Sequence, residues 1–139
     1  MTITLGELAN SVSVLERIKY QTHDFKTGYW IMRNMKNMSE SFEFFIRTRE
    51  EIYSKYCDKL ITDSNPQGTY FVVQEDGLIR FNLKEDADVN AFDQEMNELM
   101  NLPCDNIEPY KLNIEVLGQL PGIELSTDDI FAIDYLLSE

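Results

Sequence analysis

Apolar residues between Asp24 and Leu60 recur at alternating spacings of four and three, the period of one face of an α-helix. This face comprises Ile31, Met35, Met38, Phe42, Phe45, Ile52 and Tyr56, with Arg49 in a position that the period assigns to an apolar residue. No proline interrupts the stretch, so we expect one continuous amphipathic helix about 55 Å long. One domain of 139 residues is small for such a helix, and part of its apolar seam is expected to meet another copy of the chain. The seam residues in question are Met38, Phe45, Arg49, Ile52 and Tyr56.

A shorter helix is predicted before the long one. Thr4 and Glu7 have the spacing of a capping box, in which two side chains satisfy free N–H groups at the start of a helix. An apolar series with helical spacing begins just after Thr4, which predicts a helix over residues 5–20. The polar break that follows is short, with Thr22 or Asp24 as the cap of the long helix, so the two helices are expected to pack side by side.

The second half begins with a cluster of turn-forming residues over 62–68. The pair Asp76-Gly77 lies between two short runs of β-forming residues, which predicts a β-hairpin over residues 70–83. A helical apolar series follows from Val89 and is ended by Pro103.

The last part of the chain contains an alternating stretch and a second capping box. Residues 109–116 alternate between apolar and polar, which predicts a half-buried strand that joins the hairpin. Ser126 and Asp129 have capping-box spacing and predict a final helix to the C-terminus. The predicted fold class is therefore α+β, mainly α, with a small antiparallel β-sheet and two further short helices. We expect a single domain over 1–139, with a helical hairpin over 1–60 and an acidic α+β part over 61–139.

The charge is unevenly distributed along the chain. Residues 1–60 hold nine basic and eight acidic residues, whereas residues 61–139 hold three basic and 17 acidic residues, in a chain with a net charge of −13. A surface of this sign repels phosphate backbones and anionic membranes, so direct binding of nucleic acid or membrane is disfavoured. An acidic surface can instead keep the protein soluble, meet a basic surface on a partner protein, or imitate nucleic acid.

The remaining composition offers no chemical motif. No apolar run is long enough to cross a membrane and no secretory leader is evident, so a cytoplasmic protein is expected. Cys57 and Cys104 are expected to be free thiols, and His23 is the single histidine. We therefore predict no catalytic set, no metal site and no cofactor, and a protein that is not an enzyme.

Some residues are candidates for contact with a partner. Tyr29, Trp30 and Arg33 lie partly off the apolar seam, and such residue types are enriched in binding hot spots. Trp30 has packing against the first helix as an equally plausible use, because tryptophan is usually buried. Glu85, Asp86 and Asp88 place negative charge ahead of the third helix, which suits the helix dipole and contributes to the acidic surface. Arg49 can set register within the seam or pair with an acid on a neighbouring helix.

Three stretches resemble a family of small proteins from phages and prophages of Gram-positive bacteria. They are the leader ITLGELANSVSVLERI, the long helix, and the tail NIEPYKLNIEVLGQLPGIELSTDDIFAIDYLLSE. The resemblance implies a viral origin and expression in the host cytoplasm, and it supplies no reaction and no site residues.

These observations favour an interaction protein that binds, and possibly inhibits, a host protein such as a defence component through its acidic surface. Two alternatives remain open. One is a self-assembling structural or assembly component of the phage. The other is an oligomer that sequesters a small nucleotide-like ligand with Arg33, Arg47, Arg49 and Lys55 at a subunit interface.

Overall fold

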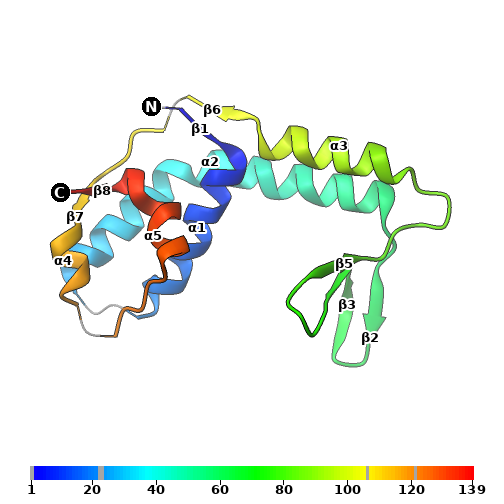
Figure 1. The fold of residues 1–139 in the computed structure, drawn as a ribbon, viewed down its shortest axis with the longest axis horizontal. Helices are drawn as coiled ribbons and strands as arrows, with labels where there is room; N and C mark the ends of the chain where they lie inside the picture. The colour runs from blue at the N-terminus through cyan, green and yellow to red at the C-terminus, as the bar shows by residue number, and fades with distance from the viewer. Residues whose placement is uncertain (1, 22–23, 106, 121) are drawn as a thin grey trace. The chain divides into compact units, whose positions relative to one another are not determined.

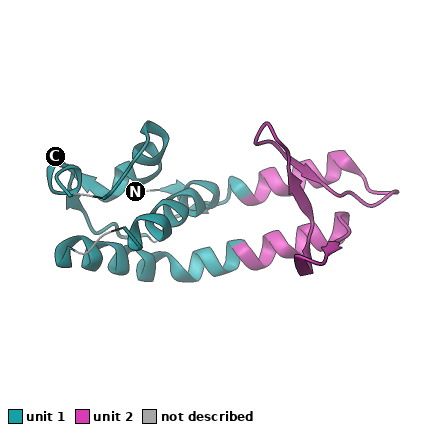
Figure 2. Ribbon diagram, turned by 90° about the horizontal axis from the view of Figure 1, so that it is seen from below, with its two compact units in different colours: residues 1–45, 100–139 teal, residues 46–99 magenta. Residues whose placement is uncertain are grey.

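The computed structural model describes residues 2–21, 24–105, 107–120 and 122–139, and its fold is α+β, mainly α (Figure 1). The chain forms two compact units (Figure 2). Unit 1 consists of residues 1–45 and 100–139, and unit 2 consists of residues 46–99. The predicted division after residue 60 differs from this one, in which the boundary lies inside the long helix.

The long helix α2 extends over Phe25–Tyr56 and confirms the predicted continuous helix. Its 32 residues correspond to a length of about 48 Å. The Asp24 carboxylate accepts hydrogen bonds from the backbone N–H and the hydroxyl of Thr27, both at 3.0 Å, and so caps the first turn. Thr22, the other predicted cap, lies outside the described residues. Unit 1 contains α2 up to Phe45, and unit 2 contains the rest.

In unit 1, helix α1 (Leu5–Lys19) begins at the predicted capping box. The N–H of Glu7 donates to Thr4 Oγ1 at 3.1 Å, and the buried side of α1 carries the predicted apolar series. Helix α5 (Thr127–Ile133) packs against α1 and begins at the second predicted capping box, formed by Ser126 and Asp129. The Ser11 hydroxyl donates to the Ala132 carbonyl at 2.6 Å, which joins the two helices at a buried polar contact.

The strand predicted over residues 109–116 is wrong in most of its length and in its partner. Strand β7 (Leu112–Asn113) pairs in parallel with β8 (Leu137–Ser138), and helix α4 begins immediately afterwards (Ile114–Gly118). The Asn113 side chain accepts from the N–H of Glu115 at 2.8 Å, and this cap starts a helix where the alternation predicts a strand. The predicted final helix ends at Ile133 and continues as the 3₁₀ helix η1 (Asp134–Leu136) before β8. Strand β1 (Ile3–Thr4) pairs antiparallel with β6 (Pro103–Cys104).

Unit 2 contains the predicted β-hairpin and a second one. Strands β4 (Phe71–Val73) and β5 (Ile79–Phe81) pair antiparallel across the Asp76-Gly77 turn, where Gly77 has a φ of 85°. The cluster predicted as a turn instead forms β2 (Leu60–Thr62) and β3 (Asn65–Thr69), which also pair antiparallel. Only the Asp63-Ser64 step between them is a turn, so turn-forming residue types extend into a strand here.

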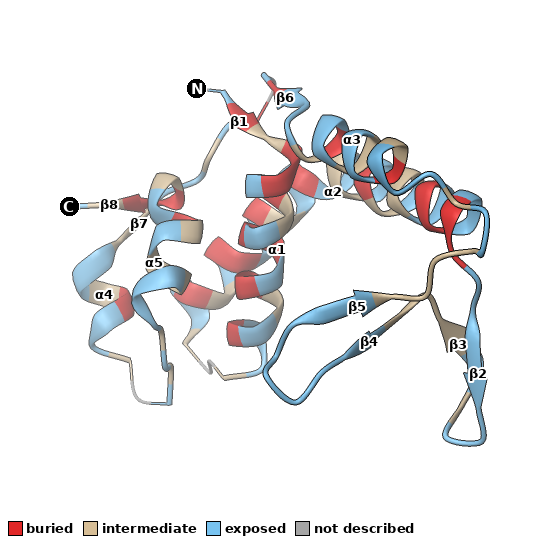
Figure 3. Ribbon diagram, turned by 45° about the vertical axis from the view of Figure 1, so that its right-hand side comes forward, coloured by how far each residue is buried: buried red, intermediate tan, exposed pale blue. Residues whose placement is uncertain are grey.

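Helix α3 (Val89–Met100) confirms the predicted third helix, and unit 2 contains it up to Leu99. Phe92 is buried and its ring lies 5.6 Å from that of Tyr56 on α2 and 5.1 Å from that of Phe81 on β5. Tyr53 joins the same cluster, 5.3 Å from Phe81. The buried positions of unit 2 lie on its helices and at Cys57, directly after α2, whereas the two hairpins are mostly exposed (Figure 3). The core of unit 2 is therefore an aromatic cluster that fixes one hairpin to two helices.

Candidate interaction surface

Tyr29, Arg33 and Tyr110 form a cluster at the surface of unit 1. The Arg33 guanidinium lies 4.5 Å from the centre of the Tyr110 ring, and its Nη1 donates to the Tyr29 hydroxyl at 3.3 Å. The two tyrosine rings meet edge to face with centres 5.6 Å apart. Tyrosine and arginine held in this way lose little side-chain freedom on binding, which is a property of hot-spot residues.

The position of Tyr110 is fixed by a buried amide on α2. Asn34 is 1% exposed, and its Nδ2 donates to the Tyr110 carbonyl at 2.8 Å while its Oδ1 accepts from the Tyr110 N–H at 3.0 Å. One side chain therefore satisfies both backbone groups of Tyr110. Since Asn34 follows Arg33 directly, the same turn of α2 positions the loop residue and supplies the cation that stacks on it.

Further apolar residues of α2 are exposed beside this cluster. Phe25, Tyr29 and Met32 are spaced by four and three, so they share one side of the helix, and they are 83%, 41% and 55% exposed. We call the set Phe25, Tyr29, Met32, Arg33 and Tyr110 the aromatic–arginine face. From Phe25 to Ser39 the sequence contains three basic residues and no acidic one, in a chain of net charge −13. The helix is therefore locally positive here.

The structure assigns Trp30 to the core and corrects its prediction as a contact residue. Trp30 is completely buried, and its Nε1 donates to the Leu136 carbonyl at 3.0 Å. The rotation of about 100° per residue turns Trp30 away from the side that Tyr29 occupies. Leu136, which accepts this hydrogen bond, lies near the other end of the sequence, so no local pattern reveals the burial of Trp30.

The predicted seam is covered by the chain itself. Met38 and Phe45 are buried in unit 1, and Ile52 and Tyr56 are buried in unit 2. Tyr135 donates to the Met38 sulfur at 3.5 Å, and the Tyr56 ring meets Phe92 as described above. These four side chains are therefore buried within their own units, where other elements of the same chain cover them. Arg49 lies over the Tyr53 ring at 5.7 Å, within unit 2.

The predicted acidic contact residues belong to unit 2 and have different surroundings. Asp88 caps α3, because its Oδ1 accepts from the N–H of Ala91 at 3.1 Å. Glu85 and Asp86 are exposed in the turn before the helix. Of these three, Glu85 and Asp86 are thus the carboxylates with no capping contact in the described structure. Tyr29 and Arg33, the other predicted contact residues, lie together in unit 1.

The described residues offer no metal site, since no group of three potential ligands comes together among them. Burial raises the pKa of both the Cys57 and the Cys104 thiols, which keeps them in the unreactive protonated form. The two thiols are free and buried in the structure, as predicted. His23 lies outside the described residues. Across those residues, no helix combines the length and the apolar character that a membrane crossing requires.

Compared with models of protein families, with curated proteins and with solved structures, the chain matches none.

Proposed function

We propose that this chain is a non-enzymatic, phage-encoded interaction protein that binds a host protein through the aromatic–arginine face of unit 1. The observation that carries the proposal is the ordered stack of Tyr29, Arg33 and Tyr110 beside the exposed Phe25 and Met32. Monomeric proteins rarely expose contiguous apolar side chains without a use, and tyrosine and arginine dominate the energetics of protein interfaces.

The charge pattern suggests how a partner is approached. The whole chain is strongly acidic, which attracts a partner with a basic surface over a distance of about 8–10 Å at physiological salt. In this proposal, the part of the partner protein that contacts α2 faces Lys26, Arg33 and Lys36. That part of the partner is therefore apolar or acidic. If the partner is a defence component and this contact covers its active or binding surface, the chain blocks that host function.

A photo-crosslinking experiment in host cytoplasm tests the proposal. A crosslinking amino acid replaces Met32, which is 55% exposed on α2, and a second version carries it at Phe131, which is 74% exposed on α5. We expect one discrete protein adduct from position 32 and none of the same mass from position 131. The adduct should weaken in the double variant Tyr29→Ala, Arg33→Ala.

Salt separates the two parts of the proposed contact. Attraction between the acidic surface and a basic partner should fall steeply between about 0.05 and 0.5 M salt, whereas the apolar contact of Phe25 should persist. Absence of an adduct at position 32, or an equal adduct at position 131, would remove the proposal.

A self-assembling phage component is the second candidate, and one observation favours it. The spacing of Phe25, Tyr29 and Met32 is that of a coiled-coil stripe, which a second copy of the helix can cover. A ligand-sequestering oligomer has less support. Its proposed cations are divided, with Arg33 stacked on Tyr110 in unit 1 and Lys55 paired with Glu95 at 3.3 Å in unit 2.

A further inference from the structure

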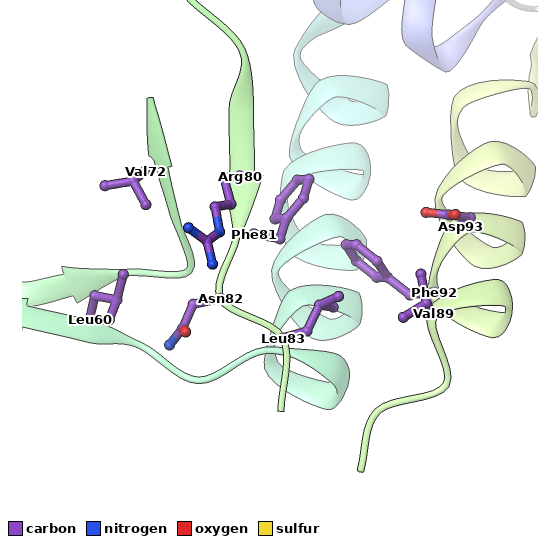
Figure 4. Close-up of a pocket in the computed structure, with 9 residues that line it drawn as sticks. All are labelled: Leu60, Val72, Arg80, Phe81, Asn82, Leu83, Val89, Phe92 and Asp93. Carbon is purple, nitrogen blue, oxygen red and sulfur yellow. The ribbon is translucent and has the colours of Figure 1, made fainter. Parts of the chain in front are cut away.

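Unit 2 contains a pocket of about 660 Å³ between its hairpins and the start of α3 (Figure 4). This volume is within the range of about 300–1,000 Å³ found for small-molecule sites. All of its lining residues lie between positions 60 and 93, so the pocket belongs to unit 2 alone. Most of them are apolar, and the charged ones are Arg80 and Asp93.

Because side chains alternate along a strand, Phe81 and Arg80 leave β5 on different sides. Phe81 points toward α3, where its ring meets that of Phe92 edge to face at 5.1 Å. Arg80 leaves β5 on the other side, in the direction of Leu60 and Val72 (Figure 4). Leu60 and Val72 are 37% and 49% exposed, so aliphatic surface lies open beside the guanidinium.

Arg80 is the positively charged group of this pocket, and it is available to a ligand. In the part of the chain that the structure describes, its side chain makes no hydrogen bond or ion pair. The Asn82 Nδ2, by contrast, donates to the Asp58 carbonyl at 2.9 Å and ties the pocket wall to the segment that follows α2. An unpaired guanidinium beside aliphatic surface is a feature suited to a carboxylate.

We propose that this pocket binds a small carboxylic acid with an apolar body, and that Arg80 pairs with its carboxylate. The apolar body lies on Leu60 and Val72 and extends toward Val89 and Phe92. Asp93 fixes the orientation, because a carboxylate at the α3 end of the pocket meets a like charge. The net charge of −13 disfavours the approach of free acids to the molecule as a whole, so a carboxylate needs a local cation such as Arg80 to bind.

Three probes with the same alkyl chain test the assignment: decanoate, decanol and decylammonium, each kept below its micelle concentration. Binding to the full chain is followed by amide chemical shifts in an NMR titration. We expect decanoate to bind most tightly, with the largest shifts over residues 79–83 and 89–93. Decylammonium should bind less well than decanoate here, although the net charge favours the cation.

Variants isolate the role of the guanidinium. Arg80→Met keeps the length of the side chain and should weaken decanoate binding at least about tenfold, since a charge-assisted hydrogen bond is lost, while decanol binding stays the same. Arg47→Met removes an exposed arginine of the same unit from outside the pocket and should leave both affinities unchanged.

Several outcomes would overturn the proposal. If decanol bound as tightly as decanoate, or if Arg80→Met left the decanoate affinity unchanged, the pocket would not recognise a carboxylate through Arg80. Shifts confined to residues outside the pocket would remove the site itself. Tighter binding of a short peptide with a C-terminal leucine than of decanoate would assign the pocket to a peptide end instead of a small acid.

Discussion

At the residue scale, Tyr29 and Trp30 show how adjacent aromatic residues on one helix acquire different roles. Tyr29 is 41% exposed and pairs with Arg33 at the surface, whereas Trp30 is completely buried with its indole N–H bonded to Leu136. Tryptophan has the larger ring and a single donor, so burial is favourable only where an acceptor is present, and the carbonyl of Leu136 provides it.

This difference predicts opposite responses to the loss of one polar group. Trp30→Phe should lower the free energy of unfolding by about 2–4 kcal/mol, because it leaves the Leu136 carbonyl without its donor and opens a small cavity. Tyr29→Phe, the matched control at the next position, removes an exposed hydroxyl and should change it by less than about 0.5 kcal/mol. Urea denaturation followed by circular dichroism measures both, and equal effects would contradict the assignment of Trp30 to the core.

The ion pair at the start of α5 predicts a dependence on pH. The Arg17 side chain, and then the backbone N–H of Ser126, hold the pKa of Asp129 below its usual value of 3.8. A lowered carboxyl pKa stabilises the folded state above that usual value, and the stabilisation is lost as the pH falls through the folded pKa. Asp129→Asn should therefore be less stable than the parent protein at neutral pH. The difference in free energy of unfolding between the two proteins should become smaller below pH 3.8.

Urea midpoints across this pH range provide the measurement. Asp128→Asn is the control, since its carboxylate lies in the same helical turn while the Arg17 contact belongs to Asp129. A gap between Asp129→Asn and the parent protein that stays constant with pH would argue against the ion pair as its source.

At the element scale, the caps decide where helices begin. Asp88→Ala should cost about 1 kcal/mol of stability because α3 loses the carboxylate that accepts from Ala91. Asp86→Ala, two residues earlier and exposed, should have little effect on unfolding. Hydrogen exchange of the first amides of α3 should accelerate in the first variant only. Equal exchange in the two variants would show that Asp88 is not the cap.

Local caps and turns also decide which elements can be predicted from the sequence. The capping boxes at Thr4 and Ser126 and the Asp76-Gly77 turn act through residues a few positions apart, so their helices and hairpin are confirmed. The strand predicted over residues 109–116 forms only at Leu112–Asn113, because the Asn113 side chain caps a helix that replaces the strand from Ile114 onward. Tyr29 stacks with Tyr110 and Trp30 donates to Leu136, residues about 80 and 106 positions away, which local spacing cannot identify.

At the scale of the whole molecule, the long helix belongs to two compact units, and this changes the test for self-assembly. Ile52 is 8% exposed, so Ile52→Asp should destabilise the folded chain by about 4 kcal/mol through lost burial and a buried charge. Met32→Asp alters the exposed stripe of the same helix and should leave the melting temperature nearly unchanged. An effect on assembly from Ile52→Asp alone would thus report unfolding and not an interface.

Native mass spectrometry of the untagged protein, combined with thermal melts of both variants, then separates the two proposed functions. If the chain assembles through the aromatic–arginine face, the parent protein is an oligomer and Met32→Asp is a folded monomer. An oligomer that survives Met32→Asp would exclude this face as the contact between copies. A parent mass of 16.2 kDa would exclude self-assembly and leave the stripe of Phe25, Tyr29 and Met32 uncovered, which is the state that binding to a host protein requires.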